Sequence, residues 1–166
     1  MNNWKYLIFP MVLLLLCLVP ASVPAAPPAA VKISYSEARV ALLDGAAEIS
    51  CPEDKLMRSL KVNDTVRAGC EVSTGAGSRI ELVLPDKSRI RFAEKSKFKF
   101  VQIDRKETGE GAVAVSLSVG KAWSNVRKSL SGKEGKFEIS CQNAVAGVRG
   151  TIYRMDVATD QSALVK

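Results

Sequence analysis

Short runs in which apolar and polar residues alternate dominate the chain from about residue 37 onward. Such alternation places every second side chain on one face and is typical of half-buried β-strands. The clearest case predicts a hairpin, with strands at residues 79–84 and 89–92 joined by a turn at residues 85–88. Residues 97–101 alternate in the same way and place two phenylalanines on one face.

A second hairpin is predicted around Asp44-Gly45, a pair that supplies the backbone conformation of a tight turn. Its strands would be residues 40–43 and 46–49. Strands of this length, each with one apolar face, predict an all-β fold built as a two-sheet sandwich or a jelly roll.

The stretch from residue 113 to residue 126 is predicted as two separate strands. Residues 113–119 alternate and end at Gly120, where a strand is expected to stop. Residues 121–126 would form the next strand, which carries Trp123. Trp123 and Tyr153 offer either a sugar-stacking platform or two core side chains, and we favour core packing for both.

The N-terminus has the organisation of a secretory signal peptide: one positive charge, a short apolar run over residues 6–19 and then small residues. The run is shorter than the roughly 20 residues of a membrane-spanning helix. We expect cleavage after Ala25, an Ala/Pro-rich leader over residues 26–36 and one β domain over residues 37–166. An uncleaved membrane anchor is the alternative.

Cysteine usage is consistent with export. Cys17 belongs to the apolar run, since Leu16 stands where a lipoprotein signal requires a small residue. Of Cys51, Cys70 and Cys141, two can form a disulfide in three ways, or all three can be buried thiols. A bond between the first two would close a loop of about 20 residues and add about 3 kcal/mol.

Composition argues against catalysis. The chain has no histidine, which excludes Ser-His-Asp and Cys-His catalysis and most catalytic zinc sites. No Cys-x-x-Cys spacing or distinctive carboxylate pair occurs, so we expect no enzyme, metal or cofactor.

The formal net charge of +7 favours anionic neighbours such as acidic polysaccharide or an acidic protein face. An exported protein is not expected to bind nucleic acid.

The segment at residues 144–155 contains Gly147, Val148, Arg149, Gly150 and Thr151. It resembles the Val-Arg-Gly-Thr signature of the FecR domain family. Three upstream segments resemble that family in the expected order, with Asn63 and Lys87 in place of its usual glycines: residues 60–66, residues 72–75 together with 78–84, and residues 85–90.

This resemblance implies an exported all-β domain of jelly-roll-like form. The best-known members are inner-membrane regulators, in which a cytoplasmic part controls a sigma factor and a periplasmic part receives a signal. A chain that begins with a signal peptide is expected to be a stand-alone exported version. The family pattern continues beyond Lys166, so the domain is expected to lack its last strands, or to pair its open edge with a partner.

Within the motif, two glycines three residues apart predict a sharply bent joint between strands, where they supply backbone freedom. Arg149 would either bind a carboxylate or phosphate, or hydrogen-bond carbonyls exposed by the turn, and we favour the second role. Residues 147–151 are therefore interpreted as a structural turn.

The leading functional hypothesis is a non-enzymatic, periplasmic or secreted sensing and protein-interaction module of a Gram-negative-type envelope. Its partner would be an unidentified envelope protein. The alternative is an envelope or surface module that binds anionic polysaccharide through its positive charge, Trp123 and Tyr153. Membrane contact is expected only through an uncleaved signal.

Overall fold

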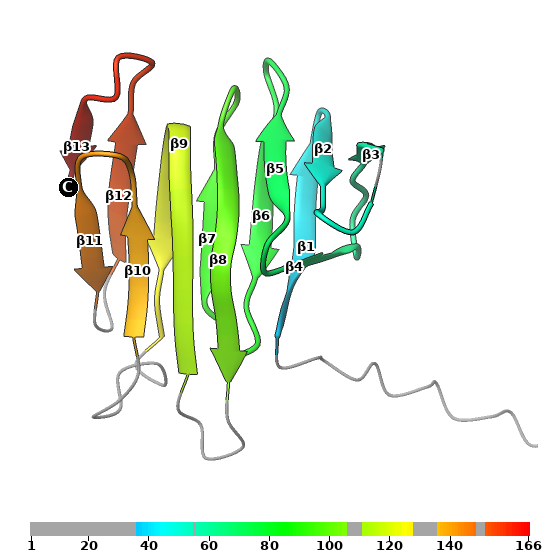
Figure 1. Ribbon diagram of the computed structural model, residues 1–166, viewed down its shortest axis with the longest axis horizontal. Helices are drawn as coiled ribbons and strands as arrows, with labels where there is room; N and C mark the ends of the chain where they lie inside the picture. Colours follow the sequence, from blue (N-terminus) through cyan, green and yellow to red (C-terminus); the bar gives the residue numbers. More distant parts are fainter. Residues whose placement is uncertain (1–35, 55, 106–110, 128–135, 149–151) are drawn as a thin grey trace, which may run out of the picture. The chain divides into compact units, whose positions relative to one another are not determined.

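The computed structural model describes residues 36–54, 56–105, 111–127, 136–148 and 152–166 (Figure 1). Within these ranges the secondary structure consists of β-strands, which confirms the all-β prediction. None of the described residues belongs to a helix with the length and hydropathy needed to cross a membrane. The predicted signal peptide and nearly all of the leader lie outside the described residues.

The strands are β1 (Glu37–Asp44), β2 (Ala47–Ser50), β3 (Arg58–Ser59), β4 (Thr65–Arg67), β5 (Glu71–Thr74), β6 (Arg79–Val83), β7 (Arg89–Phe92), β8 (Lys97–Arg105), β9 (Gly111–Asn125), β10 (Lys136–Ser140), β11 (Val145–Val148), β12 (Ile152–Val157) and β13 (Ala163–Val165).

The long strand β9 connects two groups of strands, which we call the first and second arms (Figure 1). Its first half pairs antiparallel with β8 and parallel with β10. Its second half pairs antiparallel with β7 and β12. The first arm therefore contains β2, β3, β5, β8, β10 and β11, and the second contains β1, β4, β6, β7, β12 and β13.

Gly120 does not end a strand, contrary to the prediction, but lies inside β9. Before it, Val113 and Leu117 are buried, whereas after it Ala122 and Ser124 are buried. The buried positions thus change from odd to even numbers at Gly120, which has φ +111°. A side chain there would place its Cβ 2.5 Å from Ser96 Cα. This local irregularity turns Trp123 away from the core side of the strand.

The predicted hairpin around Asp44-Gly45 is wrong in its pairing. Gly45 does turn the chain, with φ +83°. However, β1 pairs with β4 and β6, whereas β2 pairs with β3 and β5. The turn therefore passes the chain from the second arm to the first, because an Asp-Gly pair sets local backbone geometry and not the partner of each strand.

The predicted hairpin of β6 and β7 is confirmed, because the two strands pair with each other and the expected apolar side chains face the core. Ile80 lies opposite Phe92 and Leu82 lies opposite Ile90, and all four side chains are buried. The register follows the apolar alternation, since a slip of one residue would turn every apolar side chain toward solvent.

Aromatic rings of the two arms meet in the core. The rings of Phe92 on β7 and Phe98 on β8 stack with centroids 3.5 Å apart and planes 5° from parallel. Phe137 on β10 and Tyr153 on β12 form an edge-to-face pair with centroids 6.3 Å apart. These rings belong to one buried apolar cluster, whose removal from water provides most of the driving force for folding.

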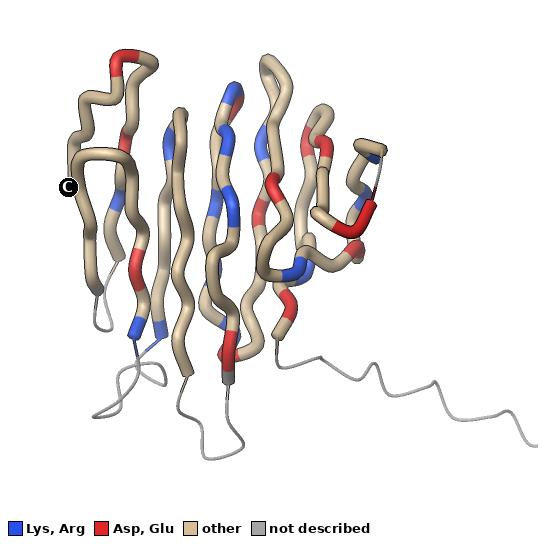
Figure 2. Tube along the Cα trace, in the orientation of Figure 1, with Lys and Arg blue, Asp and Glu red and all other residues tan. Residues whose placement is uncertain are grey.

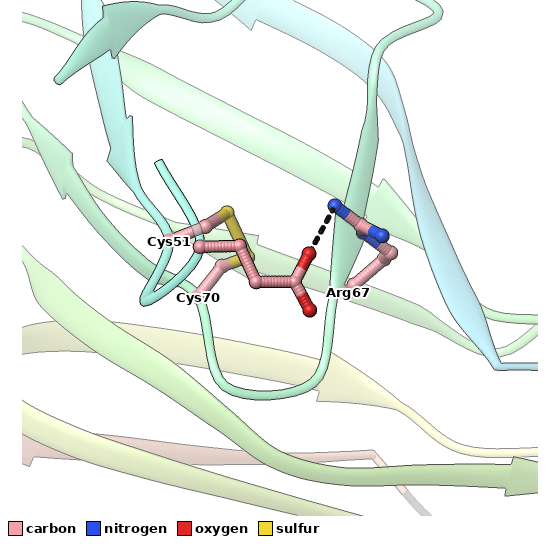
Figure 3. The surroundings of a disulfide bond; sticks show 4 residues. Cys51, Arg67 and Cys70 are labelled. Carbon is pink, nitrogen blue, oxygen red and sulfur yellow. Dashed lines mark ion pairs between the residues drawn. A yellow bond between two sulfur atoms is a disulfide. The ribbon is translucent and has the colours of Figure 1, made fainter. Parts of the chain in front are cut away.

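A disulfide joins Cys51, directly after β2, to Cys70, directly before β5 (Figure 3). It is the first of the three pairings considered from the sequence, and both cysteines are buried. Beside it, Arg67 Nη2 lies 3.5 Å from Glu53 Oε2 (Figure 3). Cys141 is a free, half-buried thiol.

Candidate functional site: the outer face of the second arm

The outer face of the second arm carries a row of large polar and aromatic side chains on adjacent strands. In the pairing register, Glu81 on β6 lies opposite Arg91 on β7, and Arg91 lies opposite Trp123 on β9. Trp123 in turn lies opposite Arg154 on β12. Neighbouring residues in these strands face the core, so this central row faces outward.

A second row beside the central row contains a small residue between charged ones. Arg79 on β6 lies opposite Asp44 on β1, and Lys121 on β9 lies opposite Asp156 on β12. Between them, the Ala93 N–H donates a hydrogen bond to the Lys121 carbonyl at 3.0 Å. Because a methyl group fills little space, the surface is hollowed at Ala93.

The resulting cavity, which we call the arginine–tryptophan hollow, has a volume of about 310 Å³. Phe92, Ala93 and Ala122 line part of it, and its walls come from four cationic side chains and one indole ring, which present mainly apolar atoms to the cavity. These walls are Arg79, Arg91, Lys121, Trp123 and Arg154. Its size lies at the lower end of the range for small-molecule pockets.

Glu81 organises one wall of the hollow. Its side chain is only 6% exposed, and its carboxylate accepts hydrogen bonds from Arg89 Nη1 and Arg91 Nε. Burial by itself raises the pKa of Glu81, but the hydrogen bonds and charges of Arg91 and Arg89 outweigh it and hold this pKa below its usual value. Glu81 therefore remains ionised and fixes the position of Arg91.

Arg91 also contacts the indole of Trp123, with its Cζ atom 4.9 Å from the ring centroid. This is the geometry of a cation–π interaction. Across the hollow, Arg154 binds the Asp156 carboxylate through two nitrogens at 2.7 and 2.6 Å. The walls on both sides are thus held by guanidinium–carboxylate pairs.

The remaining two cationic groups are less constrained. Arg79 Nη2 lies 3.0 Å from Asp44 Oδ2, and both side chains are largely exposed. Among the described residues, Lys121 takes part in no ion pair. Exposed ion pairs contribute little energy, so Arg79 can exchange its partner for another anion at small cost.

The structure separates the two aromatic residues singled out in the sequence. Tyr153 faces the core, which confirms its predicted role, and burial raises the pKa of its hydroxyl. Trp123 is half-buried on the opposite face, so the prediction of core packing is wrong for this residue. The two rings cannot form a shared platform. The shift at Gly120 explains why the sequence missed the outward indole.

The predicted structural turn is only partly described. Gly147 and Val148 lie in β11, whereas Arg149, Gly150 and Thr151 lie outside the described residues. At Gly147 the expected need for glycine is absent, because its φ is not positive and a Cβ added there would meet no atom within 4 Å. β11 belongs to the first arm and β12 to the second.

Two strands at the same side of Figure 1 have an edge that faces no other described strand. β11 pairs with β10, and β13 pairs with β12. Both carry exposed apolar side chains, including Val145 on β11 and Leu164 and Val165 on β13. Edges of this kind present backbone groups that can pair with a further strand.

The positive positions are distributed over many strands and not confined to one segment (Figure 2). The arginine–tryptophan hollow is the place where register brings several of them around an aromatic ring. None of these residues was singled out by the sequence except Trp123, because the grouping depends on strand pairing. In the described residues, no group of three or more His, Cys, Asp or Glu side chains is placed to hold a metal ion.

The FecR protein family matches residues 71–166, which is more than half of the chain. The match includes the hairpin of β6 and β7 and the motif at residues 147–151, but not the resemblance at residues 60–66. No curated protein matches the chain. No solved structure matches it either. On the extent of the family match, the chain belongs to the FecR family.

Proposed function

We propose that this protein is a non-enzymatic sensing and interaction module of the cell envelope, periplasmic or secreted. Family membership supports this proposal, since the FecR domain is a signalling-related domain generally associated with the Gram-negative envelope. The N-terminal sequence supports export. A chain without histidine supports a binding role over the commonest kinds of hydrolytic catalysis.

The partner in this proposal is an envelope protein that adds a strand to the sheet. The observation that carries it is the pair of edges at β11 and β13, where Val145 is 66% and Leu164 51% exposed. Strand addition satisfies the backbone groups of such an edge and buries its apolar side chains.

Photo-cross-linking in intact cells tests this partner. A cross-linking amino acid at Val145 or Leu164 is expected to capture an envelope protein. The same residue at Val101 serves as the control, because Val101 is 58% exposed but lies inside β8, which pairs with β9 through Phe100 and Gln102 on either side of it. Capture at all three positions alike, or at none, would contradict the proposal.

A second candidate function is binding of anionic polysaccharide, which is favoured by the cationic and aromatic walls of the arginine–tryptophan hollow. Binding that depends on such charges weakens as salt screens them. Affinity for acidic glycans should therefore fall between about 0.05 and 0.5 M NaCl. Binding that is insensitive to salt, or no binding, would count against this function.

We also propose that the two arms form the sheets of a sandwich of jelly-roll-like form. The ring pairs Phe92–Phe98 and Phe137–Tyr153 support it, because each pair joins strands of different arms. An experimental structure in which these rings lie apart would overturn this arrangement.

A further inference from the structure

We propose that the arginine–tryptophan hollow binds one uronate unit, a sugar ring that bears a carboxylate, within an anionic polysaccharide. This inference rests on the second proposed function and assigns it a site and a ligand chemistry. Four cationic side chains and one indole border a single hollow of about 310 Å³, a volume suited to one sugar ring.

The cationic side chains favour a carboxylate. A guanidinium presents paired N–H donors that match the two oxygens of a carboxylate. The outer face already contains this arrangement at Arg154, which binds the two oxygens of Asp156 through two nitrogens. A ligand carboxylate would meet Lys121, which has no ion-pair partner among the described residues, and Arg79, which would exchange its exposed pair with Asp44 for the ligand.

Trp123 supplies the surface for the sugar ring. Its indole lines the hollow beside Ala93, and Arg91 holds the indole in place from β7 at 4.9 Å. Arg91 is in turn held by the buried carboxylate of Glu81. Glu81 and Arg91 are therefore positioning residues, whereas Lys121, Arg79 and Trp123 contact the ligand.

A second hollow adjoins the first and favours a polymer over a free sugar. It has a volume of about 260 Å³ and lies over β1, β6 and β7. Arg79 and Arg91 line both hollows. Two cavities that share a pair of arginines can receive successive units of one chain, so longer oligouronates should bind more tightly than the monosaccharide.

Isothermal titration of the purified protein with tetragalacturonate tests the inference. The changes Lys121→Gln and Trp123→Ala are each expected to weaken binding at least about tenfold, which corresponds to about 1.4 kcal/mol. Lys99→Gln is the matched control, since it removes one exposed positive charge from β8 of the first arm. Its affinity should stay within about twofold of the unmodified protein. Thermal melting of each variant checks that it remains folded.

Three further titrants separate the ligand classes. The methyl ester of tetragalacturonate, which lacks the charge, should bind at least about tenfold more weakly. Preferential binding of a sulfated tetrasaccharide would overturn the choice of carboxylate. Preferential binding of hexaglutamate would overturn the proposal that the ligand is a sugar and would assign the hollow to an acidic protein.

The outcomes also distinguish this inference from the function on which it rests. If polysaccharide binding is unaffected by Lys121→Gln and Trp123→Ala, the hollow is not the binding site. The second proposed function would then still stand. A failure of every acidic glycan to bind would overturn both.

Discussion

Arg91 on β7 lies directly opposite Trp123 on β9, with its guanidinium carbon 4.9 Å from the centre of the indole ring. The same arginine donates a hydrogen bond from Nε to the buried carboxylate of Glu81. One side chain thus couples a buried charge to an aromatic ring on the surface. Changes at Glu81 should therefore be detectable at Trp123.

Replacing Glu81 with Gln should lower the free energy of unfolding by about 1–3 kcal/mol, because Arg89 and Arg91 lose their charged acceptor. Release of Arg91 should also change the fluorescence of Trp123 in the folded state. Urea denaturation followed by fluorescence measures both effects. Glu94→Gln, at an exposed position, is the control. An unchanged emission spectrum in the folded Glu81 variant would contradict the coupling.

Stability should also depend on pH through Glu81. The folded-state pKa lies below the ordinary value of 4.5, so ionised Glu81 stabilises the fold above about pH 4.5. That contribution is lost as the pH falls through the lowered pKa of the folded state. Denaturation midpoints measured from about pH 6 to about pH 3 should fall more steeply for the unmodified protein than for Glu81→Gln. Parallel curves would show that Glu81 has an ordinary pKa.

The turn between β6 and β7 places a lysine where the backbone favours glycine. Lys87 has φ +68°, and its side chain is exposed. Lys87→Gly should raise the free energy of unfolding by about 1 kcal/mol, because a left-handed conformation costs a residue with a Cβ about that much. Lys87→Ala keeps the Cβ and should bring no gain. Equal gains in both variants would assign the effect to the lost charge.

Asn63, the other position where a family glycine is replaced, has φ +74°. Asparagine tolerates this conformation better than lysine does, so Asn63→Gly should stabilise the protein less than Lys87→Gly. Urea denaturation of the two variants side by side measures the difference. A larger gain at Asn63 would contradict this explanation.

Gly120 and Gly147 allow a comparison between a strand position that requires glycine and one that does not. Gly120→Ala combines φ +111° with a Cβ 2.5 Å from Ser96 Cα, and should cost at least about 3 kcal/mol. Gly147→Ala meets no atom within 4 Å and should change stability by less than about 0.5 kcal/mol. Thermal and urea unfolding measure both. Similar losses would mean that Gly147 has a backbone requirement of its own.

The disulfide should stabilise the fold by restricting the unfolded chain. Cys51 and Cys70 are separated by 19 positions, so replacing both with Ser should cost about 3 kcal/mol. Cys141→Ser, at the free thiol, is the control and should cost much less. Peptide mapping without reductant should recover the 51–70 link. Recovery of a link to Cys141 would contradict the structure.

The sequence predicts most accurately where the relevant interactions are local. The hairpin of β6 and β7 lies within 14 residues, 79–92, and the structure confirms its two strands and the turn between them. The turn at Asp44-Gly45 is equally local and is also present, but its strands pair with β6 and β5 instead of with each other. The choice between these pairings depends on segments farther along the chain.

The arginine–tryptophan hollow shows the same division. Arg79, Arg91, Lys121 and Arg154 come from four strands and gather only because of the order in which those strands pair. Trp123 faces the hollow because the buried positions of β9 shift by one at Gly120. Apolar alternation on either side of that glycine predicts a strand but does not reveal the shift.

By itself, the sequence determined the all-β class, the family and the side chains that face the core in strands such as β6, β7 and β12, because alternation and turn chemistry act between near neighbours. Only the tertiary structure decided which strands pair, which two cysteines are joined and that Trp123 lies among arginines. Those outcomes depend on the burial of a common core by residues distant in the chain, exemplified by the stacking of Phe92 on Phe98 across the two arms.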